Sequence, residues 1–532
     1  MSKFFIADPL HINVKNFGSL YEYLNESKST VILNEERQEW LSLFGDYSSK
    51  KDSLLEEYTY LQTLSSNELY ELSILEVNIF KAARAETLSL LITKTDFNDN
   101  ALPSNTRDLF DLILEKDREA LLWNMASAIQ WINYWSPIIK QHNPKFILVF
   151  SGSLIYARTL LELLKNRAPR AFVLESFFTG SDNYIEEKYE PIANNSDLKF
   201  MAYYRSLGAG ESPTERDRSR NKAINKILAA KNKNVTQPPE NSKKLFTNNN
   251  PTLLIVGQVL NDFSVLEYKG IGLNTLAFYK EAIEKIIQET DFNIVFKAHP
   301  WERKKKNIQI PFTLNALKNH FSVNKHSYGC ENRLLLLEDY NIKSVFEQTD
   351  YVMGLNSQAL LEAAFEGFQP IQFADAFYGS KGFTSDYTPE SLHEFVCDLN
   401  NDVIPKKLGL EQYRLFEEFI TKALQFSLVS AFPSGKVILK TIFQITPHIA
   451  LTNNPVEKAV TVPAKQVSQT QTTKPIQPSK NQSNAIDPTP EKPTKSKTKK
   501  KLAKFLKTPK KFFLDSKNTK IRWLHHFFWA NS

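Results

Sequence analysis

Two hydrophobic patterns divide this chain: short uninterrupted apolar runs, and longer segments with apolar residues at helical spacing. The runs Lys145–Phe150 and Ala171–Leu174 predict buried strands, and Leu154–Arg167 between them predicts an amphipathic helix. This order of strand, small-residue turn and helix favours a doubly wound parallel sheet. The turn, Ser151-Gly152-Ser153, is not a G-x-G-x-x-G sequence and does not indicate a dinucleotide site.

The residues before this unit are mostly helical in pattern. Phe4–Ala7 is a short apolar opening, and Leu20–Leu24 begins a helix. From about Glu35 to Ile139 the sequence is rich in Leu, Glu and Lys at helical spacing. We expect this stretch to be a helical insertion in the first α/β half.

A polar connection rich in Pro and Asn, residues 235–250, predicts an interdomain linker before a second α/β set. This set begins with an apolar run that predicts a strand. Its expected order of strand, helix, strand, helix and short helix falls on Thr252–Val259, Asn274–Glu289, Phe292–Ala298, Glu331–Leu337 and Ser344–Gln348.

The next stretch, residues 349–384, predicts a strand, a helix and another extended run. Tyr351–Leu355 is the apolar strand, Asn356 and Ser357 are capping residues where it stops, and Gly367 is a typical helix C-cap. A helix that opens with Ser after a buried strand offers backbone N–H groups to an anion. From the local pattern alone, a plain helix cap is an equally good interpretation.

The composition fits a globular protein of two domains with extensions, since 42% of the 532 residues are hydrophobic. Only Cys330 and Cys397 occur, which argues against a disulfide framework and favours a reducing compartment. The N-terminus lacks the apolar core of a signal peptide, and no stretch approaches the roughly 18–20 apolar residues of a spanning helix. We therefore expect a cytoplasmic protein.

The net charge of +7 is unevenly distributed. Residues 492–532 hold 12 Lys, Arg522 and one acid, Asp515, which gives +12 and leaves −5 on the first 491 residues. The basic character belongs to the tail, which weakens any nucleic-acid interpretation of the body. From about Thr446 to Thr498 the composition shifts to Pro, Thr, Gln, Ser, Asn and Lys, which is typical of a disordered linker.

Residues 349–384 resemble a segment of bacterial capsule polysaccharide biosynthesis proteins. The characterised members of that family are GT-B-fold glycosyltransferases that transfer Kdo, an eight-carbon acid sugar, from CMP-Kdo. The segment reads N-S-x-x-x-x-E-A-x-x-x-G-x-P-[IV], followed by A-F-Y-x-x-x-G-[FL]-T. The matching positions are Asn356, Ser357, Glu362, Ala363, Gly367, Pro370, Ala376, Phe377, Tyr378, Gly382, Phe383 and Thr384. The resemblance covers about 250–390 well and 145–200 weakly.

The resemblance implies an α/β protein of GT-B fold, with two Rossmann-like domains, a helical N-domain insertion, a disordered linker and a basic C-terminal tail. We place an acceptor-side domain at residues 1–245 and a nucleotide-sugar-binding domain at 250–446. The linker covers 447–498, and a basic aromatic membrane-association segment covers 499–532. The implied function is a glycosyltransferase of capsule or lipopolysaccharide assembly that transfers Kdo with retention to form a β-linkage.

The resemblance makes His299, Asp262 and Glu175 candidate catalytic residues. His299, in VFKAHP, matches an H-P pair that lies against the nucleotide in the family and in several CMP- and CDP-dependent GT-B transferases. It can donate a hydrogen bond to a phosphate or a proton to the leaving group. A lone His at a strand end is more often structural.

Asp262 matches the acid of the family's G-Q-V-x-x-D-x-S, the candidate nucleophile, but otherwise reads as a turn or helix cap. Asn261 stands where relatives often carry another Asp. Glu175 is a partial match, since Ser176 and Phe177 replace Asp and Gly of the family's E-D-G-F. A Glu here can act as acid/base on the acceptor hydroxyl, and a salt-bridged structural Glu is the alternative.

The expected donor-binding residues match the family or flank its H-P pair: Gln258, Lys297, Pro300, Asn356, Ser357 and Glu362. For Lys297 the alternative is an ordinary solvated charge, which is usual near a strand end. The sequence has no D-x-D at a strand end, no H-E-x-x-H and no Cys/His cluster, so we expect no metal and no cofactor beyond the CMP-sugar substrate. The phosphate charge is then met by helix N-termini and cations.

Two alternatives remain open. One keeps the fold but uses another nucleotide-activated sugar, or CDP-glycerol as in teichoic-acid-type polymerases, although those enzymes usually lack the G-Q-V-x-x-D and A-F-Y matches. The other is a non-catalytic scaffold that tethers polysaccharide assembly proteins to a membrane.

The final segment resembles K-L-x-K-[FL]-x-x-x-P-x-x-F-F-x-D at an end of many capsule and lipopolysaccharide transferases. Lysines with clustered aromatics suit an anionic leaflet better than nucleic acid. The expected partners are a nucleotide-sugar donor, a lipid-linked or glycan acceptor and an anionic membrane surface, with the protein peripheral at the inner face of the cell membrane and no nucleic acid bound.

Overall fold

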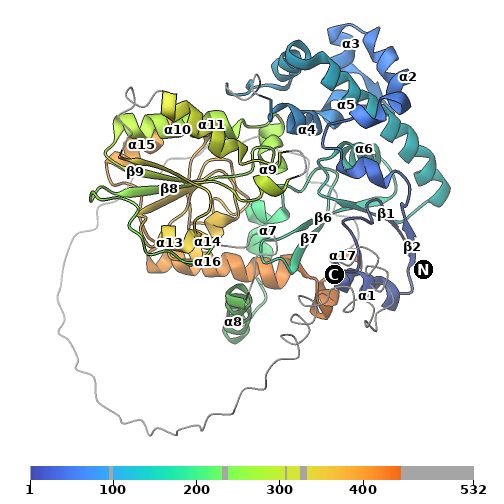
Figure 1. Ribbon diagram of the computed structural model, residues 1–532. Helices are drawn as coiled ribbons and strands as arrows, with labels where there is room; N and C mark the ends of the chain where they lie inside the picture. Colours follow the sequence, from blue (N-terminus) through green and yellow to red (C-terminus); the bar gives the residue numbers. More distant parts are fainter. Residues whose placement is uncertain are drawn as a thin grey trace, which may run out of the picture. The chain divides into compact units, whose positions relative to one another are not determined.

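The computed structural model describes residues 2–444, apart from 95–96, 98–99, 230–237, 306–307 and 324–331. The expected linker at 447–498 and the tail segment at 499–532 lie outside the described residues, as does Cys330. The described part contains two six-stranded sheets, with helices packed on the faces of each (Figure 1). None of its helices is both long and apolar enough to cross a membrane.

The first sheet has the strand order β14-β7-β6-β5-β1-β2. Strands β2, β1, β5 and β6 run parallel, whereas β7 is antiparallel to β6 and β14 is antiparallel to β7. The strands are β1 (Lys3–Ile6), β2 (Thr30–Leu33), β5 (Phe146–Phe150), β6 (Arg170–Ser176), β7 (Asp182–Glu187) and β14 (Val429–Ser430). The predicted strand, turn and helix unit is therefore present as β5, α6 (Ile155–Leu164) and β6.

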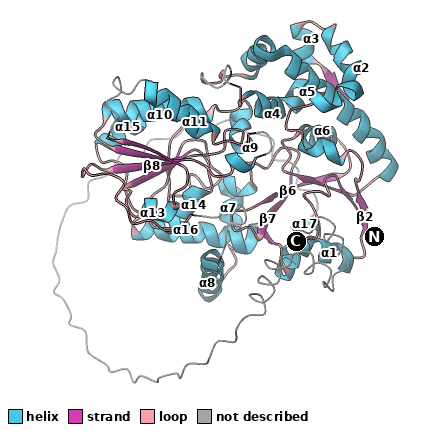
Figure 2. Ribbon diagram, viewed as in Figure 1, coloured by secondary structure: helices cyan, strands magenta, loops and turns pink. Residues whose placement is uncertain are grey.

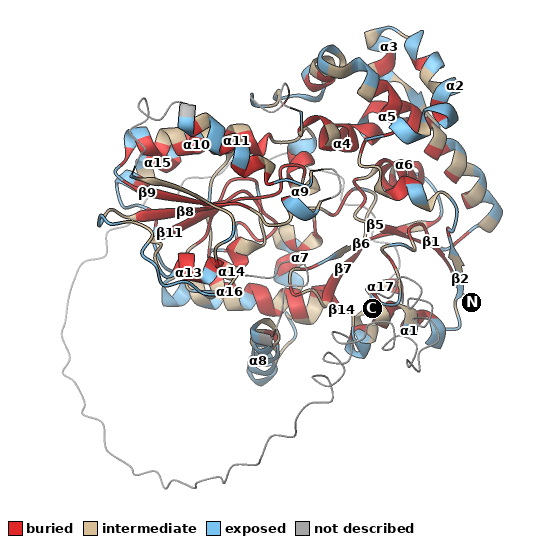
Figure 3. Cartoon of the chain, viewed as in Figure 1, coloured by how far each residue is buried: buried red, intermediate tan, exposed pale blue. Residues whose placement is uncertain are grey.

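Side chains of this sheet alternate between two cores, because successive residues of a strand point to opposite faces. Phe4 and Ile6 enter one core together with Phe443 of α17 (Lys436–Gln444). Phe5 enters the other, larger core. Figure 3 shows the buried strands of both sheets between their helical layers.

The predicted helical insertion is confirmed in outline, with a small two-stranded hairpin inside it. Its helices are α2 (Lys51–Gln62), α3 (Ser66–Glu71), α4 (Ile79–Leu91) and α5 (Thr106–His142), and the hairpin consists of β3 (Ser73–Ile74) and β4 (Val77–Asn78). Helix α4 packs on α9 (Phe263–Leu266) of the second half. The insertion thus contacts an element that follows the first strand of the other sheet.

The second sheet is fully parallel, with the order β10-β9-β8-β11-β12-β13. Numbered within this half, the order is 3-2-1-4-5-6, that of a Rossmann fold. Its strands are β8 (Thr252–Val256), β9 (Asn293–Lys297), β10 (Leu334–Leu337), β11 (Tyr351–Gly354), β12 (Ile371–Gln372) and β13 (Ser385–Asp386).

Helices cover both faces of this sheet (Figure 2). One layer holds α10 (Thr275–Glu289), α11 (Phe312–Val323) and α15 (Leu392–Asn400), and the other holds α13 (Ile342–Phe346), α14 (Ala359–Phe365) and α16 (Leu410–Lys422). The remaining helices of the described part include α1 (Gly18–Glu26), α7 (Met201–Ser206) and α8 (Pro213–Ala229).

One element differs from its sequence-based prediction. Glu331–Leu337 was expected to be helical, but Leu334–Leu337 forms strand β10, which pairs in parallel with β9 from Ile294 to Lys297. A run of four Leu has no polar positions to distinguish a helix from a strand. The free edge of β9 decides the outcome by offering its backbone hydrogen bonds.

The end of the predicted second domain returns to the first sheet. Strand β14 pairs with β7, and Leu439 and Phe443 of α17 fill the core beside Phe4, although the predicted domain extended from 250 to 446. The segment following α16 therefore completes the N-terminal half.

Candidate active site

Each sheet has a topological switch point, where consecutive strands leave in opposite directions from a central pair, and ligands bind at the carboxyl ends of such strands. In the first sheet the switch lies between β1 and β5. In the second it lies between β8 and β11. Most of the predicted site residues lie at the ends of these strands or of their neighbours β6 and β9, or in the loops that follow.

A hydrogen-bond network bridges the switch point of the second sheet. Gln258 Nε2 donates to Asn356 Oδ1 at 2.8 Å and to Ser264 Oγ at 2.7 Å. Asn356 Nδ2 donates to the Ser264 carbonyl at 3.0 Å. Gln258 and Asn356 are both buried, so they hold the loops together. The buried Gln258 Oε1 has no hydrogen-bond partner among the described residues.

The expected helix start at Asn356 and Ser357 is wrong by two residues. Helix α14 begins at Ala359, and its N-cap is Gln358, whose side chain makes no capping bond. Ser357 Oγ accepts the Ala359 N–H at 3.3 Å, and the Ser357 carbonyl accepts the Tyr378 hydroxyl at 2.7 Å. Of these two residues, Ser357 is the one whose side chain can turn to an anion, because the Asn356 amide is already bonded to Ser264.

Asp262 is the N-cap of α9, and its carboxylate accepts the Ser264 N–H at 2.9 Å. The capping interpretation is thus correct as geometry, and it leaves the second carboxylate oxygen outside this bond. The helical insertion holds α9 in place, because Arg84 donates to the Leu266 carbonyl at 2.8 Å. Asn261 Nδ2 donates to the Ser89 carbonyl at 3.3 Å, so this departure from the family pattern faces the insertion.

His299 is held as a neutral hydrogen-bond donor. Burial is the main reason why its pKa falls to about 4, and the cations of Lys297 and Lys305 lower it further against the opposing charge of Asp262. The Trp301 N–H donates to His299 Nδ1 at 3.1 Å, which places the ring proton on Nε2. At neutral pH this ring donates a hydrogen bond but has no excess proton to give.

Two lysines lie beside His299, and only one was predicted. Lys297 is buried, and its ammonium donates to the Glu338 carbonyl at 2.6 Å, so it is not the solvated charge expected at a strand end. Lys305 donates to the Asn261 carbonyl at 3.0 Å, and burial lowers its pKa to about 8 against the charges of Asp262 and Glu302. The basic run after the H-P pair was the sequence signal for Lys305.

Glu175 projects from β6 of the first half toward this group. Burial raises its pKa to about 7, and Asp262 adds to the rise. Three groups lower the Glu175 pKa and so oppose this rise. They are the Ser176 N–H, which donates to the carboxylate at 2.9 Å, the Ser151 hydroxyl and the charge of His11. Glu175 forms no ion pair with a described residue, which disfavours the salt-bridged structural interpretation.

Glu362 and Pro300 are less closely associated with these residues. Glu362 lines a separate cavity of about 420 Å³ together with Phe178, Leu361 and Phe365. Burial raises its pKa. Pro300 is partly buried and directly follows His299. The structure therefore places Glu362 apart from the Gln258 and Asn356 network.

The A-F-Y segment of the family pattern joins the two halves. Asn194, in the loop after β7, donates through Nδ2 to the Ala374 carbonyl at 3.1 Å and accepts the Phe377 N–H at 2.8 Å. Lys381 donates to the Lys199 carbonyl at 2.9 Å. This motif therefore fixes the second half against the first and supports Ser357 through Tyr378.

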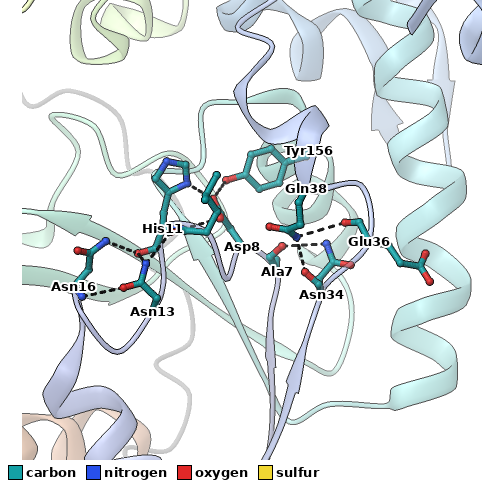
Figure 4. Close-up of polar contacts among 10 residues, drawn as sticks. Ala7, Asp8, His11, Asn13, Asn16, Asn34, Glu36, Gln38 and Tyr156 are labelled. Carbon is teal, nitrogen blue, oxygen red and sulfur yellow. Dashed lines mark hydrogen bonds and ion pairs between the residues drawn. The ribbon is translucent and has the colours of Figure 1, made fainter. Parts of the chain in front are cut away.

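Sequence reasoning missed Asp8 and His11, which follow β1. Asp8 is fully buried, and its carboxylate lies 2.7 Å from His11 Nδ1 and also accepts the Tyr156 hydroxyl (Figure 4). The available signal was an Asp and a His three residues apart directly after the first apolar strand. Among the described residues, no group of three His, Cys, Asp or Glu side chains is arranged to hold a metal ion.

Solved structures with weak similarity to this chain include three enzyme structures. Two Thermosulfurimonas dismutans KpsC structures are described as a beta Kdo 2,4 transferase and a beta Kdo 2,7 transferase. They share 17% and 16% identity with this chain, cover 56% and 59% of it and 87% and 90% of their own chains, and have TM-scores of 0.35. A Staphylococcus aureus MnaA structure with UDP shares 10% identity over 80% of this chain and 95% of its own, with a TM-score of 0.29. No curated protein matches the chain.

The family described as "Capsule polysaccharide biosynthesis protein" matches residues 199–398. This segment contains the second sheet together with Gln258, Asp262, His299 and Ser357. It is also the segment in which the sequence resemblance was found. Over residues 199–398, the chain is therefore similar to the capsule polysaccharide biosynthesis family.

Proposed function

We propose that this protein is a glycosyltransferase of surface polysaccharide assembly that transfers Kdo from CMP-Kdo with retention, forming a β-linkage on a lipid or glycan acceptor. The observation that carries the proposal is the convergence of Asp262, His299, Lys305 and Glu175, whose charges act on one another across the carboxyl edges of two Rossmann-like sheets. The family match over the second half supports the same substrate class.

The donor phosphate is bound by the second half. His299 donates from Nε2, Lys305 supplies a positive charge, and Ser357 adds a hydroxyl. Each is a charge-assisted interaction with phosphate oxygens, about 1.5–3 kcal/mol apiece. These hydrogen-bonding groups are in position before the substrate arrives. The Trp301 N–H orients the His299 imidazole, and the Asn261 carbonyl holds the Lys305 ammonium.

Transfer proceeds in two displacements. Asp262 attacks the anomeric carbon, and the bond to CMP breaks with its electron pair leaving on the phosphate. The acceptor hydroxyl then attacks the same carbon, gives up its proton to Glu175, the acid/base candidate on the acceptor side, and displaces Asp262. Two inversions restore the configuration.

The test is nucleotide release by purified full-length protein from a panel of CMP-Kdo, another CMP-activated acid sugar, CDP-glycerol and UDP-N-acetylglucosamine. We expect cleavage of CMP-Kdo above its spontaneous rate. Asp262→Asn is expected to abolish it while CMP binding, measured by calorimetry, stays near normal. Nucleotide release from CDP-glycerol or UDP-N-acetylglucosamine alone would mean that this compound, and not CMP-Kdo, is the donor. No nucleotide release from any of the compounds would favour the scaffold alternative.

A further inference from the structure

The pair of Asp8 and His11 has the geometry of an oriented base outside the roles assigned so far. One oxygen of the buried Asp8 carboxylate accepts the His11 backbone N–H at 3.0 Å. The other lies 2.7 Å from His11 Nδ1 and accepts the Tyr156 hydroxyl. A carboxylate at Nδ1 keeps the proton on that nitrogen and leaves the lone pair on Nε2.

The imidazole is fixed in direction as well as in tautomer. Its ring stacks on Phe150, with centroids 4.7 Å apart and planes 11° from parallel. Asn16 Nδ2 donates to the His11 carbonyl at 3.0 Å (Figure 4). The Tyr21 hydroxyl donates to the Ile12 carbonyl at 2.7 Å, so two side chains hold the loop. Among the described residues, Nε2 of His11 has no hydrogen-bond partner, and the side chain is 36% exposed.

This pair lies at the switch point of the first sheet. Asp8 follows β1, Phe150 ends the adjacent strand β5, and Glu175 lies near the end of the next strand, β6. Burial by itself lowers the pKa of His11, but the hydrogen bond and charge of Asp8, with the charge of Glu175, outweigh it, and the net shift is upward from 6.5. The ring therefore exchanges its proton near neutral pH.

We propose that His11 is the base that takes the proton of the acceptor hydroxyl, with Asp8 orienting it and Glu175 stabilising the imidazolium. This inference rests on the proposed function and reassigns one role within it. In the second displacement the acceptor O–H bond breaks and an N–H bond forms at Nε2. The oxygen lone pair forms the new bond to the anomeric carbon, and the pair bonding that carbon to Asp262 returns to its carboxylate.

Glu175 is less suited to this task because its carboxylate is already engaged. Oε1 accepts the Ser176 N–H at 2.9 Å, and the Ser151 hydroxyl is a second donor. Nε2 of His11, by contrast, makes no hydrogen bond with a described residue, so its lone pair is available in the neutral ring.

A first experiment tests the pair without depending on catalysis. In full-length protein labelled with 13C at histidine Cε1, His11→Gln removes one of nine histidine signals and so assigns it. We expect the His11 titration midpoint to fall by at least about one pH unit in Asp8→Asn, because the variant loses a charge-assisted hydrogen bond. A smaller fall is expected in Glu175→Gln. An unchanged midpoint in both variants overturns the proposal, whether or not the protein is a transferase.

A second experiment separates donor cleavage from transfer. His11→Gln is expected to leave the single-turnover burst of CMP release near wild type and to reduce transfer to acceptor by about 10²–10⁴-fold, the usual contribution of general base catalysis. The remaining transfer should lose its acidic pH limb, which a merely structural role would not change. His393→Gln, an exposed histidine on α15, is the matched control.

The outcomes are distinct. Wild-type transfer in His11→Gln, together with its loss in Glu175→Gln, returns the base to Glu175 and overturns the proposal. Equal loss of donor cleavage and of folded protein in His11→Gln assigns the pair a structural role and also overturns it. No donor cleavage by the wild type overturns the proposed function itself, while the His11 titration still reports whether the pair exists.

Discussion

At the scale of single residues, burial and neighbouring charge decide what each candidate can do. His299 and Glu175 are both ionisable and both partly buried, yet their pKa values shift in opposite directions, to about 4 and about 7. Burial disfavours the charged form of either group, so the base loses its proton and the acid keeps its own. His299 is therefore suited to donate a hydrogen bond, and general acid catalysis by it is disfavoured.

The neutrality of His299 gives a prediction about donor binding. His299→Ala should weaken CMP binding by roughly 10- to 150-fold, the loss of one hydrogen bond to a charged group. Because a group with a pKa of about 4 stays neutral throughout, this ratio should be the same at pH 6 and pH 8. Calorimetry at both pH values measures it. A ratio that grows at least tenfold at pH 6 would show that the imidazolium binds the phosphate.

Glu175 should destabilise the protein as pH rises. A carboxyl with a folded pKa of about 7 and an ordinary value of 4.5 contributes stability that is present below pH 4.5 and lost as pH rises through 7. Relative to the wild type, Glu175→Gln should gain about 1–3 kcal/mol of unfolding free energy between pH 5 and pH 8. Urea denaturation across this range checks it, with the exposed Glu190→Gln as control. A constant difference would contradict the raised pKa.

At the scale of elements, the helical insertion of the first half stabilises α9 of the second half. Arg84 of α4 donates to the Leu266 and Ile271 carbonyls, at 2.8 and 2.7 Å, and pairs with Glu267. These contacts fix α9, whose N-cap is Asp262. A four-residue helix cannot hold its own position, since so short a helix is marginal in isolation.

Loss of the ion pair between Arg84 and Glu267 should destabilise the protein. Arg84→Ala leaves a largely buried Glu267 with only the more distant Arg158, at 3.9 Å, and should lower the unfolding free energy by about 3–5 kcal/mol. Lys81→Ala, an exposed charge on the same helix, should cost less than about 1 kcal/mol. Urea denaturation of both variants measures the difference. Similar values for the two would mean that the buried pair does not hold α9.

At the scale of the whole molecule, charge separates the described body from the tail. The first 491 residues carry −5, whereas residues 492–532 carry +12 and lie outside the described residues. An anionic bilayer attracts such a tail with about 1 kcal/mol for each basic residue near its surface. The body has no comparable excess of positive charge.

Removal of residues 492–532 should therefore release the protein from anionic liposomes while CMP affinity stays unchanged. Co-sedimentation with phosphatidylserine vesicles tests the first part, and calorimetry tests the second. Neutral vesicles serve as control and should bind neither form. Unchanged co-sedimentation of the truncated protein would exclude the tail as the membrane contact.

Local pattern was sufficient for most of the fold. The strands after Lys145 and Pro251, the helices between them and the helical insertion follow from apolar spacing, because burial of one face dictates that spacing. The pattern also located His299 and Asn356 at strand ends, where parallel sheets bind ligands, and the family resemblance added Gln258 and Asp262. The same pattern could not distinguish a strand from a helix in the four leucines of β10, which only the free edge of β9 decided.

Tertiary structure decided how these residues act. Asn356 is engaged by Gln258 and Ser264, and Glu362 faces another cavity. Asp8 and His11 join the site from the loop after β1, far from β5 in the sequence. The spacing of apolar residues does not encode these contacts. The strand order of the first sheet places β1 beside β5, and folding brings the carboxyl edges of the two sheets close enough for Asp262 to act on Glu175. Sequence alone therefore determined the elements and the chemical types at their ends. The pairing of those ends, and with it each ionisation state, followed from burial and proximity in the folded chain.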